Sequence, residues 1–251
     1  MTGLVVASLV PALLDIHADA QNAAVLAARA RWQGHEARVA DVVRGEDAAD
    51  LTPDLITIGS GFDADAGEVL DALRAFEANL RRWVDAGVPL LAVGLGWELL
   101  STSVELEPGS PTPGLGLFTG RAVASGRHVG TVAVDSRWGR LVGYEYHLRD
   151  YILGEDEAPL GTIVSGVGNR EGAGGGSPEG ALRGSLVGTG IRGPVLARNP
   201  ALADDLLGRA RARRTPADVS LTVVDAQSRA DHYAHEANHI VLRNMGIGRD
   251  A

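Results

Sequence analysis

The stretch from Pro89 to Leu100 has the pattern at which many enzymes place a nucleophile. An apolar run ends at Gly94 and helix-forming residues follow, which is typical of a buried parallel strand, a tight turn and a returning helix. A side chain at that corner stands off the strand end, beside backbone N–H groups at a helix N-terminus that can hold an oxyanion. Gly94 has no side chain, so this corner lacks the attacking atom.

Two histidines and one serine lie where other chemistry could take place. His17 is close to Asp19 in the first loop, and His147 is close to Glu145. A histidine beside a carboxylate can act as an acid–base pair, but without a nucleophile to activate, a structural histidine is the favoured interpretation. Ser60 lies in a glycine-rich turn with many backbone donors, where a small turn residue is favoured over a nucleophile.

The last predicted helix, from about Gln227, carries three further histidines. At about 100° per residue, His232, His235 and His239 fall on one face, and this spacing could bind a metal. The opposite face carries an apolar stripe that already accounts for the helix: Ala230, Tyr233, Ala237, Ile240, Val241 and Met245. No matching carboxylate loop is evident, so a solvated face is favoured, and we predict neither a metal nor a cofactor.

The elements that must position these residues alternate along the first half of the chain. Four apolar runs predict strands, at Leu4–Val10, Glu36–Val42, Asp54–Ile58 and Val88–Val93. Helices are predicted at Ala23–Trp32, closed by Gly34, and as one long helix with apolar residues at spacings of three and four from Leu70 to Val84. This order predicts a doubly wound, mostly parallel α/β sheet flanked by helices, with ligands at the carboxyl ends of the strands.

The second half of the chain has a different pattern of apolar and turn-forming residues. Short alternating runs predict antiparallel hairpins at Val129–Val134, Leu141–Tyr146 and Thr162–Val167. A flexible loop at Glu171–Pro178, a strand at Leu186–Ile191, a helix from Asn199 to about Arg213 and an apolar run at Val219–Val224 follow. We expect one domain over residues 1–213 and a C-terminal extension with a helix over 214–251.

Composition excludes several classes of function. The net charge of −9 argues against a nucleic-acid partner, because phosphates would be repelled. No apolar run approaches the roughly 20 residues of a membrane span, so we expect no membrane insertion. The chain has no cysteine, hence no disulfide and no thiol nucleophile. The cytoplasm is the expected location.

Ordered sequence blocks between about Leu4 and Leu207 resemble the cobyric-acid-synthase-like class I glutamine amidotransferases, and within them the GatD-type glutaminase subunits of lipid II isoglutaminyl synthase. The blocks are Leu14–Asn22, Arg31–Gly34, Ile58–Asp63, Pro89–Leu100, Gly143–His147, Gly166–Asn169, Glu179–Ala181, Gly188–Pro194 and Arg198–Pro200. The resemblance implies a flavodoxin-like fold. It also implies a substrate pocket that includes Gly59, Ser60, Gly61, Leu95, Glu98, Glu145, Tyr146 and His147.

The resemblance breaks at the catalytic pair. Family members use a cysteine at the position of Gly94 to form a glutamyl thioester and release ammonia, with a histidine at the position of Arg192 as the base. An arginine cannot be deprotonated at any useful pH. The flanks differ as well, because Leu95 replaces a small residue, Glu98 a glutamine and Tyr146 an asparagine. We therefore predict that no catalytic residue is intact and that glutaminase activity is lost.

Three interpretations follow. The favoured one is a pseudoenzyme that acts as a non-catalytic partner or regulator of a Mur-ligase-like ATP-dependent synthetase, the partner that the resemblance implies, in lipid II amidation for peptidoglycan synthesis. The second is a pocket in which Arg192 binds glutamine or another small carboxylate, or performs altered chemistry; an intact cavity favours it, and packing of Leu95 and Trp97 into the cavity argues against it. The third is an active GatD-type glutaminase with an unrecognised nucleophile.

Overall fold

A computed structural model describes residues 3–170, 176–214 and 225–248. Its centre is a six-stranded sheet in the order β11-β12-β4-β3-β1-β2. The strands are β1 (Leu4–Leu9), β2 (Ala37–Val42), β3 (Leu55–Ile58), β4 (Leu90–Val93), β11 (Ala181–Arg183) and β12 (Leu186–Thr189). Every neighbouring pair is parallel except β11 with β12. The predicted doubly wound, mostly parallel sheet is confirmed.

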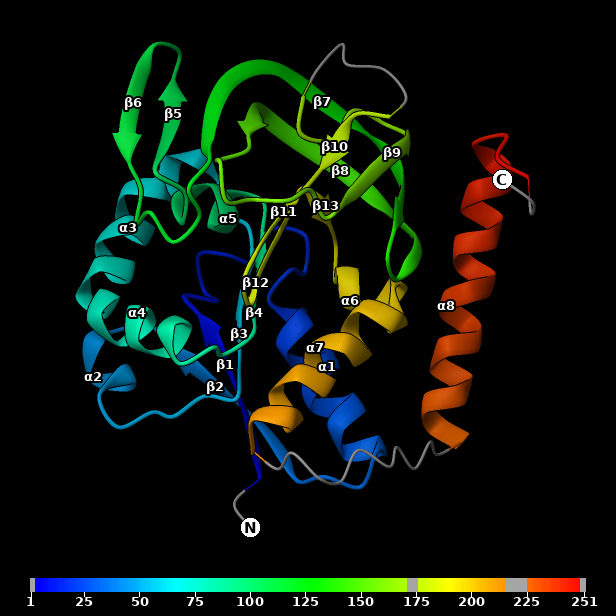
Figure 1. Ribbon diagram of the computed structural model, residues 1–251, viewed down its shortest axis with the longest axis horizontal. Helices are drawn as coiled ribbons and strands as arrows, with labels where there is room; N and C mark the ends of the chain where they lie inside the picture. Colours follow the sequence, from blue (N-terminus) through cyan, green and yellow to red (C-terminus); the bar gives the residue numbers. More distant parts are fainter. Residues whose placement is uncertain (1–2, 171–175, 215–224, 249–251) are drawn as a thin grey trace.

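Helices cover both faces of this sheet (Figure 1). One face packs on α3 (Ala66–Ala75), α4 (Glu77–Asp85) and α5 (Leu95–Leu99), and the other on α1 (Gln21–Trp32), α6 (Val195–Arg198) and α7 (Pro200–Arg214). Strand β4 shows why: Leu90 and Ala92 belong to the first core and Leu91 and Val93 to the second. An apolar run with side chains on alternate faces must be covered on both.

The single long helix predicted through Leu70 and Val84 is wrong. The chain leaves helical geometry at Phe76, where φ is −125° and ψ is 20°, so that α3 ends and α4 begins. The break allows the Phe76 ring, 1% exposed, to enter the core between the two helices. Two shorter elements, α2 (Gly45–Ala48) and the 3-10 turn η1 (Asp63–Asp65), complete this side.

A second, mainly antiparallel sheet lies above the carboxyl ends of the first (Figure 1). Its longest strands, β7 (Arg121–Ser136) and β8 (Gly139–Ile152), pair antiparallel and extend well beyond the predicted hairpins. The remaining members are β5 (Ser103–Glu107), β6 (Ser110–Pro113), β9 (Gly161–Ser165), β10 (Pro178–Glu179) and β13 (Ile191–Arg192).

The chain passes from one sheet to the other at Gly190. The strand predicted over Leu186–Ile191 is in fact two elements, because β12 belongs to the parallel sheet and β13 pairs with β8 in the antiparallel one. Arg192 pairs with Tyr144 of β8 and is therefore carried over the end of the parallel sheet. This crossover is what brings Arg192 to the corner at Gly94.

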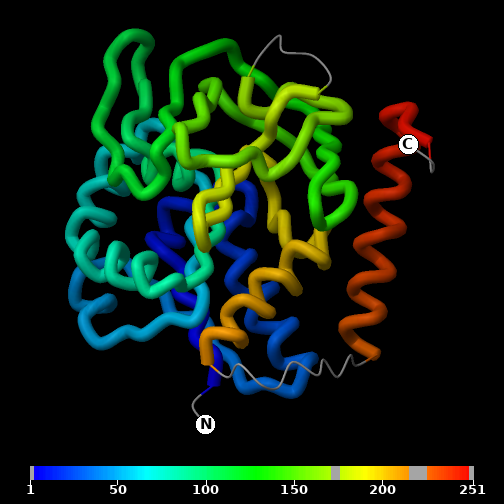
Figure 2. Tube along the Cα trace, viewed as in Figure 1, coloured from blue at the N-terminus to red at the C-terminus, as the bar shows by residue number. Residues whose placement is uncertain are grey.

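The last helix, α8 (Asp225–Asn244), lies along one side of the molecule beside α1, α6 and β8 (Figure 2). Its predicted apolar stripe does not face the core: Tyr233 is 69% and Ile240 49% exposed. The buried residues of α8 are instead Gln227, Ala234 and Asn238. Polar contacts hold the helix in place.

Two contacts hold α8. Asp231 receives a hydrogen bond of 2.6 Å from the buried Arg29 of α1. The Asn238 side chain accepts a hydrogen bond from Arg198 Nε at 3.0 Å and donates another to the carbonyl oxygen of Arg198 at 2.7 Å.

The predicted run at Val219–Val224 and most of the predicted loop at Glu171–Pro178 lie outside the described residues. Across the described part of the chain, no helix combines the length and apolar character needed to cross a membrane.

Candidate functional site

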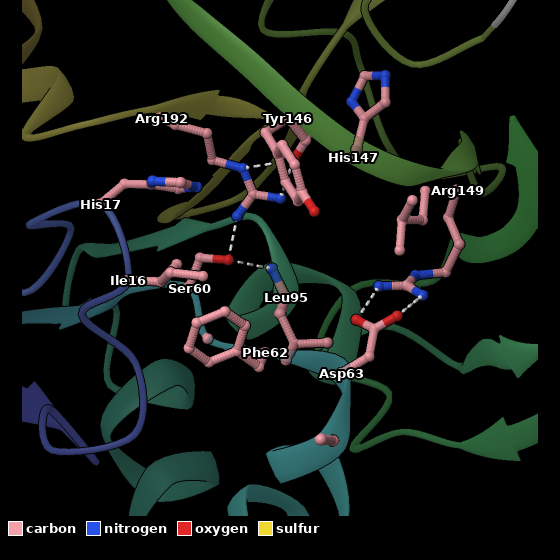
Figure 3. Close-up of a pocket in the computed structure, with 13 residues that line it drawn as sticks. Ile16, His17, Ser60, Phe62, Asp63, Leu95, Tyr146, His147, Arg149 and Arg192 are labelled. Atoms are coloured by element: carbon pink, nitrogen blue, oxygen red, sulfur yellow. Dashed lines mark hydrogen bonds and ion pairs between the residues drawn. The ribbon is translucent and has the colours of Figure 1, made fainter. Parts of the chain in front are cut away.

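A cavity of about 270 Å³ opens where the two sheets meet, at the carboxyl ends of the parallel strands (Figure 3). Its lining comes from the loop after β1, the turn after β3, the start of α5, strand β8 and Arg192. The residues are Ile16, His17, Ser60, Gly61, Phe62, Asp63, Ala64, Leu95, Tyr146, His147, Leu148, Arg149 and Arg192. This is the edge at which doubly wound sheets bind ligands.

Gly94 forms the predicted corner between β4 and α5. Its backbone has φ of 52° and ψ of −124°, a region that side-chain-bearing residues rarely occupy. The corner is fixed at both ends, because Gly94 N donates to Thr189 O at 2.9 Å and Gly94 O accepts from Glu98 N at 2.9 Å. The geometry of a nucleophile corner is thus present without the nucleophile.

The guanidinium of Arg192 occupies the space that a side chain at residue 94 would need. A Cβ built on Gly94 would lie 1.3 Å from Arg192 Nη1 and 2.0 Å from its Cζ. Arg192 Nε and Nη2 donate to the carbonyl oxygen of Tyr146 at 3.0 and 2.6 Å, and Nη1 donates to Ser60 Oγ (Figure 3). The site is therefore occupied by a cation as well as lacking a nucleophile.

The backbone donor beside the corner is also occupied. Leu95 N, the amide that follows residue 94, donates to Ser60 Oγ at 3.1 Å. In nucleophile corners the amide after the nucleophile is one of the oxyanion donors. Because Ser60 Oγ also accepts a hydrogen bond from Arg192, its oxygen binds two donors, one of them a cation, and no described side chain is hydrogen-bonded to it as a base.

The outer wall of the cavity is an ion-pair network around Arg149. Its Nε donates to Glu98 Oε2 at 2.7 Å, and its two Nη atoms donate to the Asp63 carboxylate at 2.8 and 2.7 Å. Burial lowers the pKa of Arg149, but the two carboxylates outweigh it and raise that pKa above its ordinary value. Arg149 and Glu98 are 6% and 5% exposed, so this charge-assisted pair is buried.

The histidines at the cavity are neutral at pH 7. Burial, followed by the positive charge of Arg192, lowers the pKa of His147 to about 4. The same two causes lower the pKa of His17, whose ring contacts the edges of the Tyr144 and Tyr146 rings. The Nε2 atoms of His17 and His147 are buried and have no hydrogen-bond partner among the described residues.

Two buried carboxyl groups lie behind the cavity. Burial raises the pKa of Asp19 to about 7, against the opposing charge of Arg192. Burial also raises the pKa of Glu179 to about 7, and Glu179 Oε1 accepts hydrogen bonds from Thr189 Oγ1 and Gly190 N, both at 2.8 Å. These groups exchange protons near neutral pH, but neither lines the cavity.

The structure brings together seven of the residues predicted from the sequence. The cavity is lined by His17, Ser60, Gly61, Leu95, Tyr146, His147 and Arg192. Three others lie outside its lining. Gly59 packs against the first loop, where a Cβ would lie 2.0 Å from Leu14 O, and Glu98 is held by Arg149. The Glu145 carboxylate accepts hydrogen bonds from Val167 N and Gly168 N at 2.9 and 3.0 Å, so it holds a loop.

Sequence reasoning missed Arg149 and Asp63 as members of the site. A signal for Arg149 was present, because residues two apart on a strand share a face and Arg149 follows His147 by two. The predicted histidines of α8 are at another part of the molecule, and no group of three or more metal-ligating side chains occurs among the described residues.

The fold and the corner define a class I glutamine amidotransferase-like protein. The CobB/CobQ-like glutamine amidotransferase domain family matches residues 5–200, and the chain belongs to that family. Since family members attack glutamine with a cysteine at this corner, the absence of any cysteine means that the usual nucleophile is missing.

Two curated relatives match most of the chain. The GatD subunit of lipid II isoglutaminyl synthase (glutamine-hydrolyzing) from Staphylococcus aureus is 26% identical over 80% of this chain and 82% of its own. The subunit of the same name from Streptococcus pneumoniae is 26% identical over 88% of this chain and 87% of its own.

Solved structures agree on the fold. A crystal structure of a glutamine amidotransferase matches with a TM-score of 0.55 and 17% identity, over 83% of this chain and 100% of that one. A glutamine amidotransferase from Thermotoga maritima matches with a TM-score of 0.52 and 13% identity, over 98% of this chain and 99% of that one. At such identities the likeness concerns the fold.

Proposed function

We propose that this protein is a non-catalytic glutamine amidotransferase-like subunit that associates with a Mur-ligase-like, ATP-dependent amidating enzyme and stabilises or regulates it. The proposed loss of catalysis rests on one observation: the Arg192 guanidinium occupies the space that a side chain at residue 94 would need. A glutaminase needs a nucleophile, a base and an oxyanion donor. Here the first is absent, the second is replaced by a permanent cation, and the Leu95 amide is already hydrogen-bonded.

The proposed association rests on the curated relatives, which are named as GatD subunits of lipid II isoglutaminyl synthase (glutamine-hydrolyzing). Their match extends over most of both chains, which supports a subunit role for this chain. We propose lipid II amidation as the process, in the cytoplasm, with the ligase relying on free ammonia or on a separate glutaminase.

Glutamate release from glutamine tests the loss of activity. We expect none above background from the natural chain, alone or with the purified ligase. The Gly94→Cys/Arg192→His double variant removes the cation and supplies both missing groups, so it is the variant in which release can return. Gly94→Cys alone is the matched control, because Arg192 still blocks its side chain. Release by the natural chain would refute the proposal.

Association is tested separately. The chain and the Mur-ligase-like enzyme of the same organism are mixed and passed over a sizing column, and the rate of ammonia-dependent amidation is compared with and without the chain. We expect co-elution and a changed rate or lifetime of the ligase. A chain that never co-elutes with the ligase, at concentrations where an intact glutaminase subunit does, would refute the partner role.

A further inference from the structure

Arg192 is a buried cation that has no direct ion-pair partner among the described residues. It is 5% exposed, and none of the ion pairs between described residues includes it. An arginine keeps its charge in proteins, and a buried charge without a partner is strongly unfavourable. A buried cation in this condition needs an anion.

The nearest carboxylates make no direct hydrogen bond or ion pair with Arg192. Glu98 and Asp19 act on Arg192 only at a distance, through their electrostatic effect on its pKa. The Glu98 carboxylate is already bound by Arg149. Asp19, whose pKa is raised to about 7, is only half ionised at neutral pH.

The guanidinium also has donors to spare, and it lines the cavity. Of the five N–H groups of an arginine, Arg192 uses three on Tyr146 O and Ser60 Oγ. The remaining ones have no partner among the described residues, and the Nε2 atoms of His17 and His147, which line the same cavity, are likewise unpaired. Figure 3 shows Arg192 between His17 and Tyr146, at the inner end of the cavity.

The rest of the lining selects the kind of anion. Ile16, Phe62, Leu95 and Leu148 give the cavity apolar walls. A volume of about 270 Å³ corresponds to about nine waters at the roughly 30 Å³ that each takes in the liquid. A charged head on a short aliphatic stem fits such a space, whereas a compact, fully hydrated anion such as inorganic phosphate would leave the apolar walls uncovered.

We propose that the cavity binds a small aliphatic carboxylate of about nine or ten non-hydrogen atoms, with its carboxylate on Arg192, and that it prefers this ligand to the matching neutral amide. An arginine in the place of a proton-abstracting base turns the pocket's preference from an amide to a carboxylate, because a guanidinium pairs with a carboxylate through charge-assisted hydrogen bonds. The inference rests on the proposed loss of glutaminase activity and is independent of the ligase.

Binding of two matched probes tests the inference. Glutarate and its neutral diamide, glutaramide, have the same number of non-hydrogen atoms and differ only in their end groups. Isothermal titration of the isolated full chain at pH 7 should show glutarate binding at least tenfold more tightly than glutaramide. Equal affinities, or no binding of glutarate at millimolar concentration, would overturn the inference, as would inorganic phosphate binding as tightly as glutarate.

Variants assign the preference to Arg192. Arg192→Gln should lose the preference for glutarate, whereas Arg140→Gln, which breaks an exposed pair with Asp135, should keep it. If Arg192→Gln does not fold, Leu148→Trp serves instead: it fills the cavity from a half-buried position and leaves Arg192 in place, and it should abolish glutarate binding. Tight binding in Leu148→Trp would place the ligand elsewhere and overturn the inference.

The two proposals fail in different ways. Glutamine hydrolysis by the natural chain would refute the proposed function whatever glutarate does. Glutarate binding by a chain that does not associate with the ligase would refute the partner role and leave the carboxylate site standing.

Discussion

Gly94→Ala measures whether residue 94 and Arg192 compete for one space. The new Cβ would lie 1.3 Å from Arg192 Nη1, far inside contact distance, so the guanidinium must leave its place. The backbone at Gly94, with φ of 52°, is unfavourable for alanine in addition. A single methyl group therefore acts on the backbone and on Arg192 together.

Both effects have a magnitude. A side-chain-bearing residue in a sparsely populated backbone region costs about 1–3 kcal/mol. Each hydrogen bond that the displaced guanidinium loses without replacement costs about 1.5–3 kcal/mol. We expect Gly94→Ala to lower the free energy of unfolding by about 3–5 kcal/mol, and by only about 1–3 kcal/mol when Arg192 is already alanine. The coupling energy is then about 2 kcal/mol.

Urea unfolding, followed by tryptophan fluorescence, gives this energy from the wild type, Gly94→Ala, Arg192→Ala and the double variant. Gly34→Ala is the matched control, because Gly34 has φ of +81° and nothing within 4 Å of a Cβ, so it reports the backbone cost alone. The reasoning is refuted if the two changes add to within about 0.5 kcal/mol, or if Gly94→Ala costs no more than Gly34→Ala.

Three other buried groups give measurable outcomes. Arg149→Ala should lower the free energy of unfolding by about 3–5 kcal/mol, because the Glu98 carboxylate stays buried without its partner. Urea unfolding at pH 7 measures this loss, and a loss under about 1 kcal/mol would contradict the prediction. Burial raises the pKa of Glu179 from its ordinary 4.5 to about 7 in the folded state, so the free energy of unfolding should fall by up to about 1.4 kcal/mol for each pH unit as the pH rises between these values. Glu179→Gln should remove this fall. An unchanged slope in urea unfolding across this pH range would count against it. Asn238→Ala removes two hydrogen bonds that hold α8 and should speed amide exchange in α8, whereas Tyr233→Ala, at a site 69% exposed, should not; equal exchange in both variants would disprove the anchor.

The sequence was sufficient to predict the parallel sheet and the missing nucleophile at residue 94, because both depend on local patterns. A short apolar run that ends at Gly94 and continues as a helix allows few other structures. The break at Phe76 was not predictable in this way, since apolar spacing continues through it and only packing of the ring decides where helical geometry ends. Helix α8 was misjudged for a related reason, because its buried face is set by Asp231 and Asn238 rather than by apolar residues.

The site shows the same division between local and long-range signals. That Arg192 could not act as a base followed from its chemistry alone. That its guanidinium would reach the corner depends on the pairing of β13 with β8, which joins Arg192 to Tyr144, a residue far away in the sequence, and has no local signature. Glu145 was placed in the pocket by resemblance, yet its carboxylate binds the backbone at Val167 and Gly168, a role that needs the fold to be seen.

The two departures at the corner are one change in physical terms. If residue 94 had merely lost its side chain, the corner would hold a void, and voids in well-packed interiors are unfavourable. Instead the Arg192 guanidinium fills that space and is held by Tyr146 and Ser60. Conversely, Arg192 cannot take this position while residue 94 carries a side chain. The observed position of Arg192 therefore requires a glycine at residue 94, and this dependence, together with the two unused N–H groups of Arg192, fits the proposed carboxylate site.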